Sequence, residues 1–137
     1  MIFPFYQQYP VHWGDVDALG HVNHAKYLTW FETIRCSLFT KFGLQNAGTP
    51  KLGPILVNLN INYRAPLYFP ETVRAGVGVS RIGNTSFVLQ YGLSTLSKPQ
   101  EVICDATTVI VLLDYETNKK TQISQEIREK MKSFILQ

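Results

Sequence analysis

Residues 24–42, HAKYLTWFETIRCSLFTKF, contain the clearest helical pattern in the sequence and decide which fold can surround them. Large apolar side chains recur there at steps of three and four residues, which places them on one face of an α-helix: Tyr27, Phe31, Ile34, Leu38 and Phe42. Asn23 precedes the segment as a residue type favoured at the N-cap, and Gly43 follows it as a type favoured just after a helix. A helix with such an aromatic stripe needs a sheet to cover it.

The same segment carries two opposite charges with helical spacing. Glu32 and Arg35 are three positions apart, so each is expected to pair with the other or with a neighbour. We therefore assign them a structural role.

Segments with the two-residue periodicity of β-strands stand before and after the helix. They cover residues 5–13, 55–64, 72–80, 86–97 and 101–116, with a hairpin turn at Gly83-Asn84 and a terminal helix at 124–136 capped by Ser124. Asn58, Asn60 and Asn62 share one strand face, as on a solvated or subunit-contact surface, and the other face is apolar. We expect one α+β domain over residues 1–137, a long helix wrapped by a curved antiparallel sheet of about five strands. The last four strands are expected to form a meander.

The composition narrows the classes of function. Charged residues make up 17% of the 137 residues, below the roughly 25% usual in globular domains, so we expect spare apolar surface and a homodimer or homotetramer. The net charge of +3 is dispersed, with no basic stripe for nucleic acid. No segment approaches the ~20 apolar residues of a membrane span, and the first residues, MIFPFYQQYP, lack the basic start of a signal peptide. A cytoplasmic location without a membrane partner is therefore expected.

Residues 15–24, DVDALGHVNH, gather two carboxylates, two imidazoles and an amide directly before the helix. The first backbone N–H groups of a helix lack intrahelical partners and carry partial positive charge, so they can stabilise an oxyanion. Asp17 lies close enough to Asn23 to act beside them as a nucleophile or as a base on water, with His21 and His24 orienting water or substrate. Simple helix capping or metal binding would use the same residue types.

The run WGDVDALGHVNHAKYLTWFETIR, residues 13–35, resembles the signature of hotdog-fold thioesterases of the 4-hydroxybenzoyl-CoA thioesterase type, in their YbgC-like branch. Members have an Asp-x-Asp-like loop, then Ala-x-Gly, then a Tyr-x-x-x-Phe-Glu-x-x-Arg helix. The matching residues are Asp15, Asp17, Ala18, Gly20, Tyr27, Phe31, Glu32 and Arg35. The resemblance continues through NYRAPLYFPETV and RIGNTSF and covers roughly residues 8–115.

This resemblance implies that Asp17 is the catalytic carboxylate and that N–H groups near Asn23 and His24 polarise the thioester carbonyl. His24 also matches a histidine that the YbgC-like branch places seven residues after the Asp. The run HVNHAKY is similar to an element of plant acyl-ACP thioesterases whose first histidine is functional, which here is His21. Those plant enzymes have an asparagine where this chain has Leu19, so an Asp-centred mechanism is favoured.

The resemblance also implies an acyl carrier such as coenzyme A. Substrate-binding residues are expected in the aromatic stripe at Tyr27, in the hairpin at Ser86, which this family brings near the carrier, and at Arg64 and Arg81, which can meet phosphates.

We therefore expect hydrolysis of a fatty or aromatic acyl-CoA to free acid and CoA, with no metal or redox cofactor. Three alternatives stay open. The carrier can instead be acyl carrier protein. The fold also serves dehydratases and hydratases, although this loop lacks their arrangement of histidine and acidic residue. The protein can also be a non-catalytic acyl-CoA-binding member.

Overall fold

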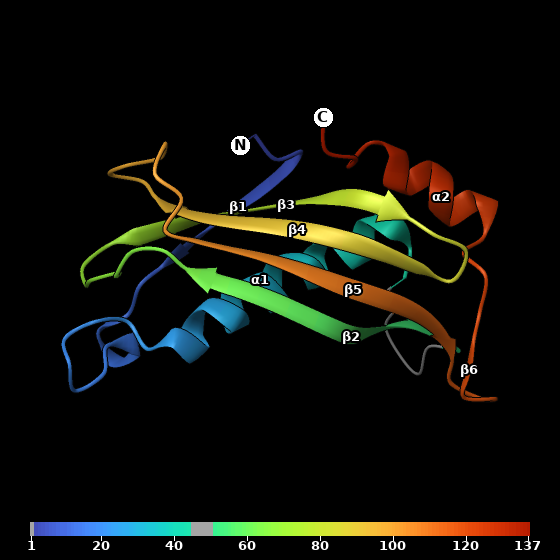
Figure 1. The fold of residues 1–137 in the computed structure, drawn as a ribbon, viewed down its shortest axis with the longest axis horizontal. Coiled ribbons are helices and arrows are strands. Elements are labelled where there is room, and N and C mark those ends of the chain that lie inside the picture. Colours follow the sequence, from blue (N-terminus) through green and yellow to red (C-terminus); the bar gives the residue numbers. More distant parts are fainter. Residues whose placement is uncertain (1, 45–50) are drawn as a thin grey trace.

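The computed structural model describes residues 2–44 and 51–137, in which two α-helices accompany a six-stranded sheet (Figure 1). The strands are β1 (Phe5–Pro10), β2 (Leu52–Tyr63), β3 (Thr72–Ile82), β4 (Ser86–Thr95), β5 (Cys104–Asp114) and the short β6 (Lys119–Lys120). The helices are α1 (His24–Phe42) and α2 (Gln125–Lys132), with a 3₁₀ turn η1 at Trp13–Asp15. Helix α1 lies against one face of the sheet (Figure 1), which confirms the expected α+β architecture.

The ends of α1 are those expected from the sequence. The Asn23 side-chain oxygen accepts a hydrogen bond from the backbone N–H of Ala25 (2.9 Å), which makes Asn23 the N-cap. Gly43 adopts the left-handed conformation (φ 78°), and its N–H bonds to the carbonyls of Phe39 and Thr40. The aromatic stripe is buried along its whole length, under the sheet.

The two ends of the chain differ from each other in how well the sequence anticipates them. Strand β1 ends at Pro10 rather than at residue 13, because the backbone N–H of His12 bonds to the Asp15 carboxylate (2.8 Å) and the chain turns into η1. Ser124 caps α2 as expected, its hydroxyl accepting a hydrogen bond from the N–H of Ile127 (3.2 Å).

In the part of the chain that the structure describes, neither helix has both the length and the hydropathy required to cross a bilayer.

The strand order is β1-β3-β4-β5-β2, with β6 paired to β5. Strands β3, β4 and β5 form a meander, but β2 pairs with β5 instead of β3, so the expected meander of four strands is wrong. Hairpin loops usually have about 2–5 residues. The proline-containing connection 64–71 is longer, and it runs from β2 at one edge of the sheet to β3, which lies next to the other edge strand, β1. On the way it passes the start of α1, where the Val22 N–H donates to the Leu67 carbonyl (2.8 Å).

Strand β2 is an edge strand that α1 covers only in part. On its inner face, toward α1, Leu59 is 38% exposed and Tyr63 is 45% exposed. A bulge between Leu56 and Asn58 interrupts its pairing with β5. An apolar strip that is open to solvent therefore runs between α1 and residues 54–63 of β2; we refer to it as the α1–β2 strip.

Candidate active site

Asp15 holds the loop before α1 in shape. Its carboxylate accepts the hydrogen bond from His12 and lies 3.6 Å from the Lys26 ammonium. Its carbonyl accepts a hydrogen bond from the N–H of Asn23 (2.9 Å). Because these contacts link the entry of the loop to the first turn of the helix, Asp15 has a structural role.

Asp17 lies in a tight turn of the same loop. Its N–H donates to the carbonyl of His21 (2.9 Å), and its Oδ1 accepts a hydrogen bond from the N–H of Leu19 (2.9 Å). Gly20 completes the turn with φ 88°, a conformation that favours glycine. Over residues 2–44 and 51–137, Oδ2 of Asp17 has no hydrogen-bond partner. One oxygen of this half-buried carboxylate is thus anchored, and the other is available to a substrate.

The first turn of α1 leaves one backbone donor free. Asn23 uses its side-chain oxygen for the N–H of Ala25 and its carbonyl for the N–H of Lys26 (3.0 Å). Within the described residues, the backbone N–H of His24 has no hydrogen-bond acceptor. This donor stands at the positive end of the helix dipole, where a developing negative charge is stabilised. Asn23 therefore shapes the site through its cap, and His24 offers the free N–H.

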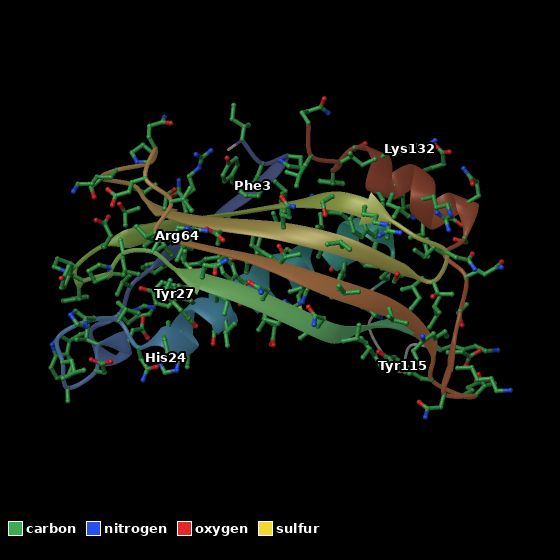
Figure 2. The ribbon with its side chains drawn as sticks, viewed as in Figure 1. Phe3, His24, Tyr27, Arg64, Tyr115 and Lys132 are labelled. Carbon is green, nitrogen blue, oxygen red and sulfur yellow. The ribbon has the colours of Figure 1, made fainter. Side chains whose placement is uncertain are left out.

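A hollow of about 300 Å³ lies beside this helix end. Four residues predicted from the sequence line it: His21, His24, Tyr27 and Arg64. Figure 2 shows the last three at the same end of the sheet. Asp17 does not line this hollow; its backbone N–H is bonded to the carbonyl of His21, which does.

Two tyrosines give the hollow its aromatic wall. The rings of Tyr27 and Tyr63 meet edge to face at 5.2 Å, and the Tyr63 hydroxyl donates to the carbonyl of His24 (3.2 Å). Burial raises the pKa of Tyr27 to about 12 and also raises the pKa of Tyr63, so both phenols stay neutral near neutral pH. Within the described residues no fully buried side-chain oxygen or nitrogen lacks a partner. The unpaired hydroxyl of Tyr27 is therefore accessible from the hollow.

Arg64 stands at the rim of the hollow and is already engaged on one side. Its Nε donates to the Asp105 carboxylate, which also accepts a hydrogen bond from the Asn62 amide (3.1 Å). The bond from Arg64 is the main cause that lowers the pKa of Asp105. The two terminal nitrogens of the guanidinium remain able to donate to a phosphate.

Arg81 and Ser86 lie at the other end of the sheet. Arg81 follows a bulge near the end of β3, and Ser86 begins β4. The intervening hairpin is bound to α2, whose Arg128 donates to the carbonyl of Gly83 (2.8 Å). Within one copy of the chain, these two residues are not brought together with Asp17 and His24.

Sequence reasoning missed two residues of the site. Tyr63 was expected only on the apolar face of a strand, and Tyr68, whose ring lies 5.6 Å from that of His21, was assigned no role. Both belong to the segment NYRAPLYFPETV, but their place depends on the pairing of β2 with β5 and on the crossing connection. The pattern of one strand does not contain that information.

Comparison with known proteins identifies the family. Residues 11–131 match the model of the Thioesterase-like superfamily. The long-chain acyl-CoA thioesterase FadM of Escherichia coli K12 is 28% identical over 126 residues, which cover 88% of this chain and 91% of FadM. Two solved structures share the fold with a TM-score of 0.85 each. The PA2801 protein of Pseudomonas aeruginosa is 30% identical, and the matched region covers 93% of this chain and 98% of the PA2801 chain. A thioesterase-superfamily protein of Jannaschia sp. CCS1 is 26% identical, with coverage of 93% and 80%.

The matched region includes the loop at Asp17, the start of α1, the hollow and almost the whole sheet. The chain therefore belongs to the Thioesterase-like superfamily, with the hotdog fold, and it is a thioester hydrolase.

Proposed function

We propose that the protein hydrolyses acyl-CoA thioesters at the start of α1, with Asp17 as the reactive carboxylate, and that it belongs to the YbgC-like branch of its superfamily. The observation that carries this proposal is the free N–H of His24 at the start of a helix whose preceding loop holds a carboxylate with only one oxygen engaged. The name of the relative FadM, a long-chain acyl-CoA thioesterase, supports coenzyme A as the carrier.

In the proposed reaction, the thioester carbonyl oxygen accepts a hydrogen bond from the N–H of His24. Asp17 either attacks the carbonyl carbon itself or removes a proton from the water that attacks it. Negative charge then develops on the carbonyl oxygen, where the N–H and the helix dipole stabilise it. Collapse of this intermediate breaks the C–S bond. CoA leaves as a thiolate and takes up a proton. If Asp17 attacks, an acyl-Asp17 anhydride forms, and water then hydrolyses it. If water attacks, the free acid forms directly, so in both routes water supplies the hydroxyl of the acid.

The walls of the hollow support a fatty or aromatic acyl group. Tyr27, Tyr63 and Pro66 present apolar surface, and Arg64 lies at the rim, where the phosphates of the carrier would arrive. His21 and His24 line the hollow, and in this proposal they orient the acyl group or a water molecule. Mostly apolar pockets favour apolar ligands.

We also propose that two copies pair through their β2 edges, as a dimer or as half of a tetramer. A long edge strand with exposed apolar residues such as Leu56 and Val57 invites such pairing. In an antiparallel pair, the Leu52 end of one β2 lies beside the Tyr63 end of the other. Ser86 and Arg81 lie at the Leu52 end of the sheet, so those of the second copy would come to the end that contains Asp17.

Thiol release from a panel of lauroyl-, benzoyl- and succinyl-CoA, together with lauroyl-acyl carrier protein, tests the activity and the carrier. We expect turnover of lauroyl- or benzoyl-CoA above that of the other two. Tight binding of lauroyl-CoA without thiol release would make the protein a non-catalytic binder and contradict the proposal. Light scattering of the same sample tests the pairing, which a stable monomer at micromolar concentration would exclude.

A further inference from the structure

A second hollow, of about 260 Å³, lies further along the α1–β2 strip. Its walls are largely apolar and come from both sides of the strip: Phe39 of α1, Leu56 of β2 and Ile110 of β5. The charged residues that line it are Arg35 and the largely exposed Glu32. A cation set in apolar walls is unusual and requires an explanation.

The protein provides hydrogen-bond acceptors for only part of the Arg35 guanidinium. The side chain is 13% exposed, and its one hydrogen bond in the described residues is a long one (3.4 Å) from Nη1 to the hydroxyl of Tyr91. The carboxylate of Glu32 lies 3.9 Å from Nη2, beyond hydrogen-bond distance, on a side chain that is 69% exposed. Tyr91 has a closer partner in Thr108 (2.7 Å). Within residues 2–44 and 51–137, most of the five N–H groups of this guanidinium thus have no protein acceptor.

The free donors of Arg35 face the hollow. Within the described residues, no side-chain nitrogen that is fully buried lacks a hydrogen-bond partner. Those of Arg35 without a partner must therefore reach accessible space, and Arg35 lines the second hollow. A ligand in the hollow can therefore reach them as an acceptor.

The two hollows lie on the same side of α1. His24, Leu28, Glu32 and Cys36 are four residues apart in succession and so share one helix face; His24 lines the first hollow, and Glu32 and Cys36 line the second. From His24 to Arg35 the helix advances by about 16 Å, at about 1.5 Å per residue. With C–C bonds of about 1.5 Å, an extended chain of about 12 to 14 carbons covers that length.

We propose that the second hollow receives the far end of a long acyl group, and that Arg35 donates a hydrogen bond there to an uncharged oxygen, a hydroxyl or a keto group. This rests on the proposed function, in which the thioester carbonyl lies at His24. The Glu32 carboxylate, 3.9 Å from Nη2, already balances the charge of Arg35, so a second carboxylate there would gain little attraction and would be repelled by Glu32. The substrate class is therefore a long-chain acyl-CoA with a neutral oxygen near its end.

The test compares lauroyl-CoA with 12-hydroxylauroyl-CoA as substrates. In the wild type we expect kcat/KM to favour the hydroxylated substrate by about tenfold, because a hydrogen bond to a charged donor is among the stronger ones. Arg35→Met keeps the length and the apolar stem and should remove or reverse this preference. Arg74→Met is the matched control: it removes a guanidinium that stacks on Tyr6, on the outer face of the sheet, and should keep the preference.

Calorimetry with dodecanoate and 12-hydroxydodecanoate separates this proposal from the hydrolytic one, since it requires no turnover. Preferential binding of the hydroxylated acid without hydrolysis of any thioester would support the subsite and contradict the proposed function. Hydrolysis with equal kcat/KM for both thioesters in the wild type would overturn the subsite, and so would a preference for dodecanedioyl-CoA. If Arg35→Met does not fold, Arg35→Lys keeps the charge without the planar fork and should still lower the preference, and an unchanged ratio would contradict the role of Arg35.

Discussion

The two ends of α1 differ in almost every physical respect. At the C-terminal end, Phe42 is fully buried, with the rings of Phe87 and Phe134 at 6.1 and 5.7 Å, and the N–H of Gly43 has two carbonyl acceptors. At the N-terminal end, His24 is exposed and its N–H has no acceptor in the described residues. At the C-terminal end, the side chain and the backbone N–H described above have partners within the protein. At the N-terminal end, the N–H of His24 remains available to a ligand.

This difference shows how one helix can serve both stability and reactivity. Apolar burial at the Phe42 end stabilises the folded state, while the dipole of the same helix concentrates positive charge at His24. In the proposed mechanism, the N-terminal end can keep a free backbone donor because the other end holds the helix in place. The two functions should therefore be separable by mutation.

The largest effect is expected at the C-terminal end. Phe42→Ala should lower the free energy of unfolding by about 3–5 kcal/mol, because it leaves a cavity among rings that cannot fully collapse. At a temperature where the variant is folded, kcat/KM per folded molecule should stay within about twofold of the wild type. Denaturant unfolding and thiol-release assays measure both quantities. Leu96→Ala, at an exposed site, is the control and should change neither; a large loss of turnover in folded Phe42→Ala would refute the separation.

At the other end the effect on activity should be the larger one. Asp17→Asn keeps the size of the side chain and the acceptor for the N–H of Leu19, but it removes the charge and the nucleophile. We expect turnover to fall by at least ~100-fold, the low end for loss of general acid–base catalysis. The unfolding midpoint should change little, and near-wild-type turnover would show that Asp17 is not the reactive group.

Asp15→Asn is the matched control two residues earlier. It weakens the contacts to His12 and Lys26, so we expect a loss of stability of about 1 kcal/mol and only a modest loss of turnover. If Asp15→Asn and Asp17→Asn behaved alike, the assignment of separate structural and catalytic roles would be wrong.

A smaller effect is expected from the helix cap. Asn23→Ala removes the acceptor for the N–H of Ala25 and should lower stability by about 1 kcal/mol. It should also lower kcat, because the first turn, which positions the N–H of His24, frays. Asn23→Asp restores an acceptor at the cap and should recover the stability. If Asn23→Ala lost stability but kept the full kcat, the first turn would not be part of the oxyanion site.

The sequence was sufficient for α1 because its signals are local. The spacing of the stripe, the cap at Asn23 and the glycine at position 43 each act within a few residues, and all three are confirmed. The resemblance to hotdog thioesterases extended this local information to the fold and the family, which the superfamily match confirms. Its narrower assignment to the 4-hydroxybenzoyl-CoA thioesterase type and its YbgC-like branch stays a prediction, and so do the roles of the site residues.

What the sequence did not determine depends on pairing between distant segments. The order of β2 and β3 follows from a crossing connection, and a strand's alternation is the same whichever neighbour it pairs with. For the same reason Tyr63 was not placed at the site. Arg35 was predicted to pair with Glu32 or with a neighbour, and the pair with Glu32 is present at 3.9 Å, but periodicity gave no sign that Arg35 also lines a hollow.

The smallest effect is expected for Tyr63→Phe, which compares two ends of β2 rather than of α1. The Tyr63 hydroxyl donates to the carbonyl of His24, and the Tyr115 hydroxyl donates to the carbonyl of Pro54; each hydrogen bond has a donor–acceptor distance of 3.2 Å. Each tyrosine is about as exposed as the other, so each phenylalanine variant should lose only about 0.5 kcal/mol, the low end for a neutral hydrogen bond. Of the two, only Tyr63 contacts His24, the residue proposed to supply the oxyanion donor. We therefore expect Tyr63→Phe to lower kcat for benzoyl-CoA about two- to threefold, whereas Tyr115→Phe leaves it unchanged, since this short acyl group does not reach the far end of the α1–β2 strip. Equal kcat values for the two variants would mean that the Tyr63 hydroxyl does not help to position the start of α1.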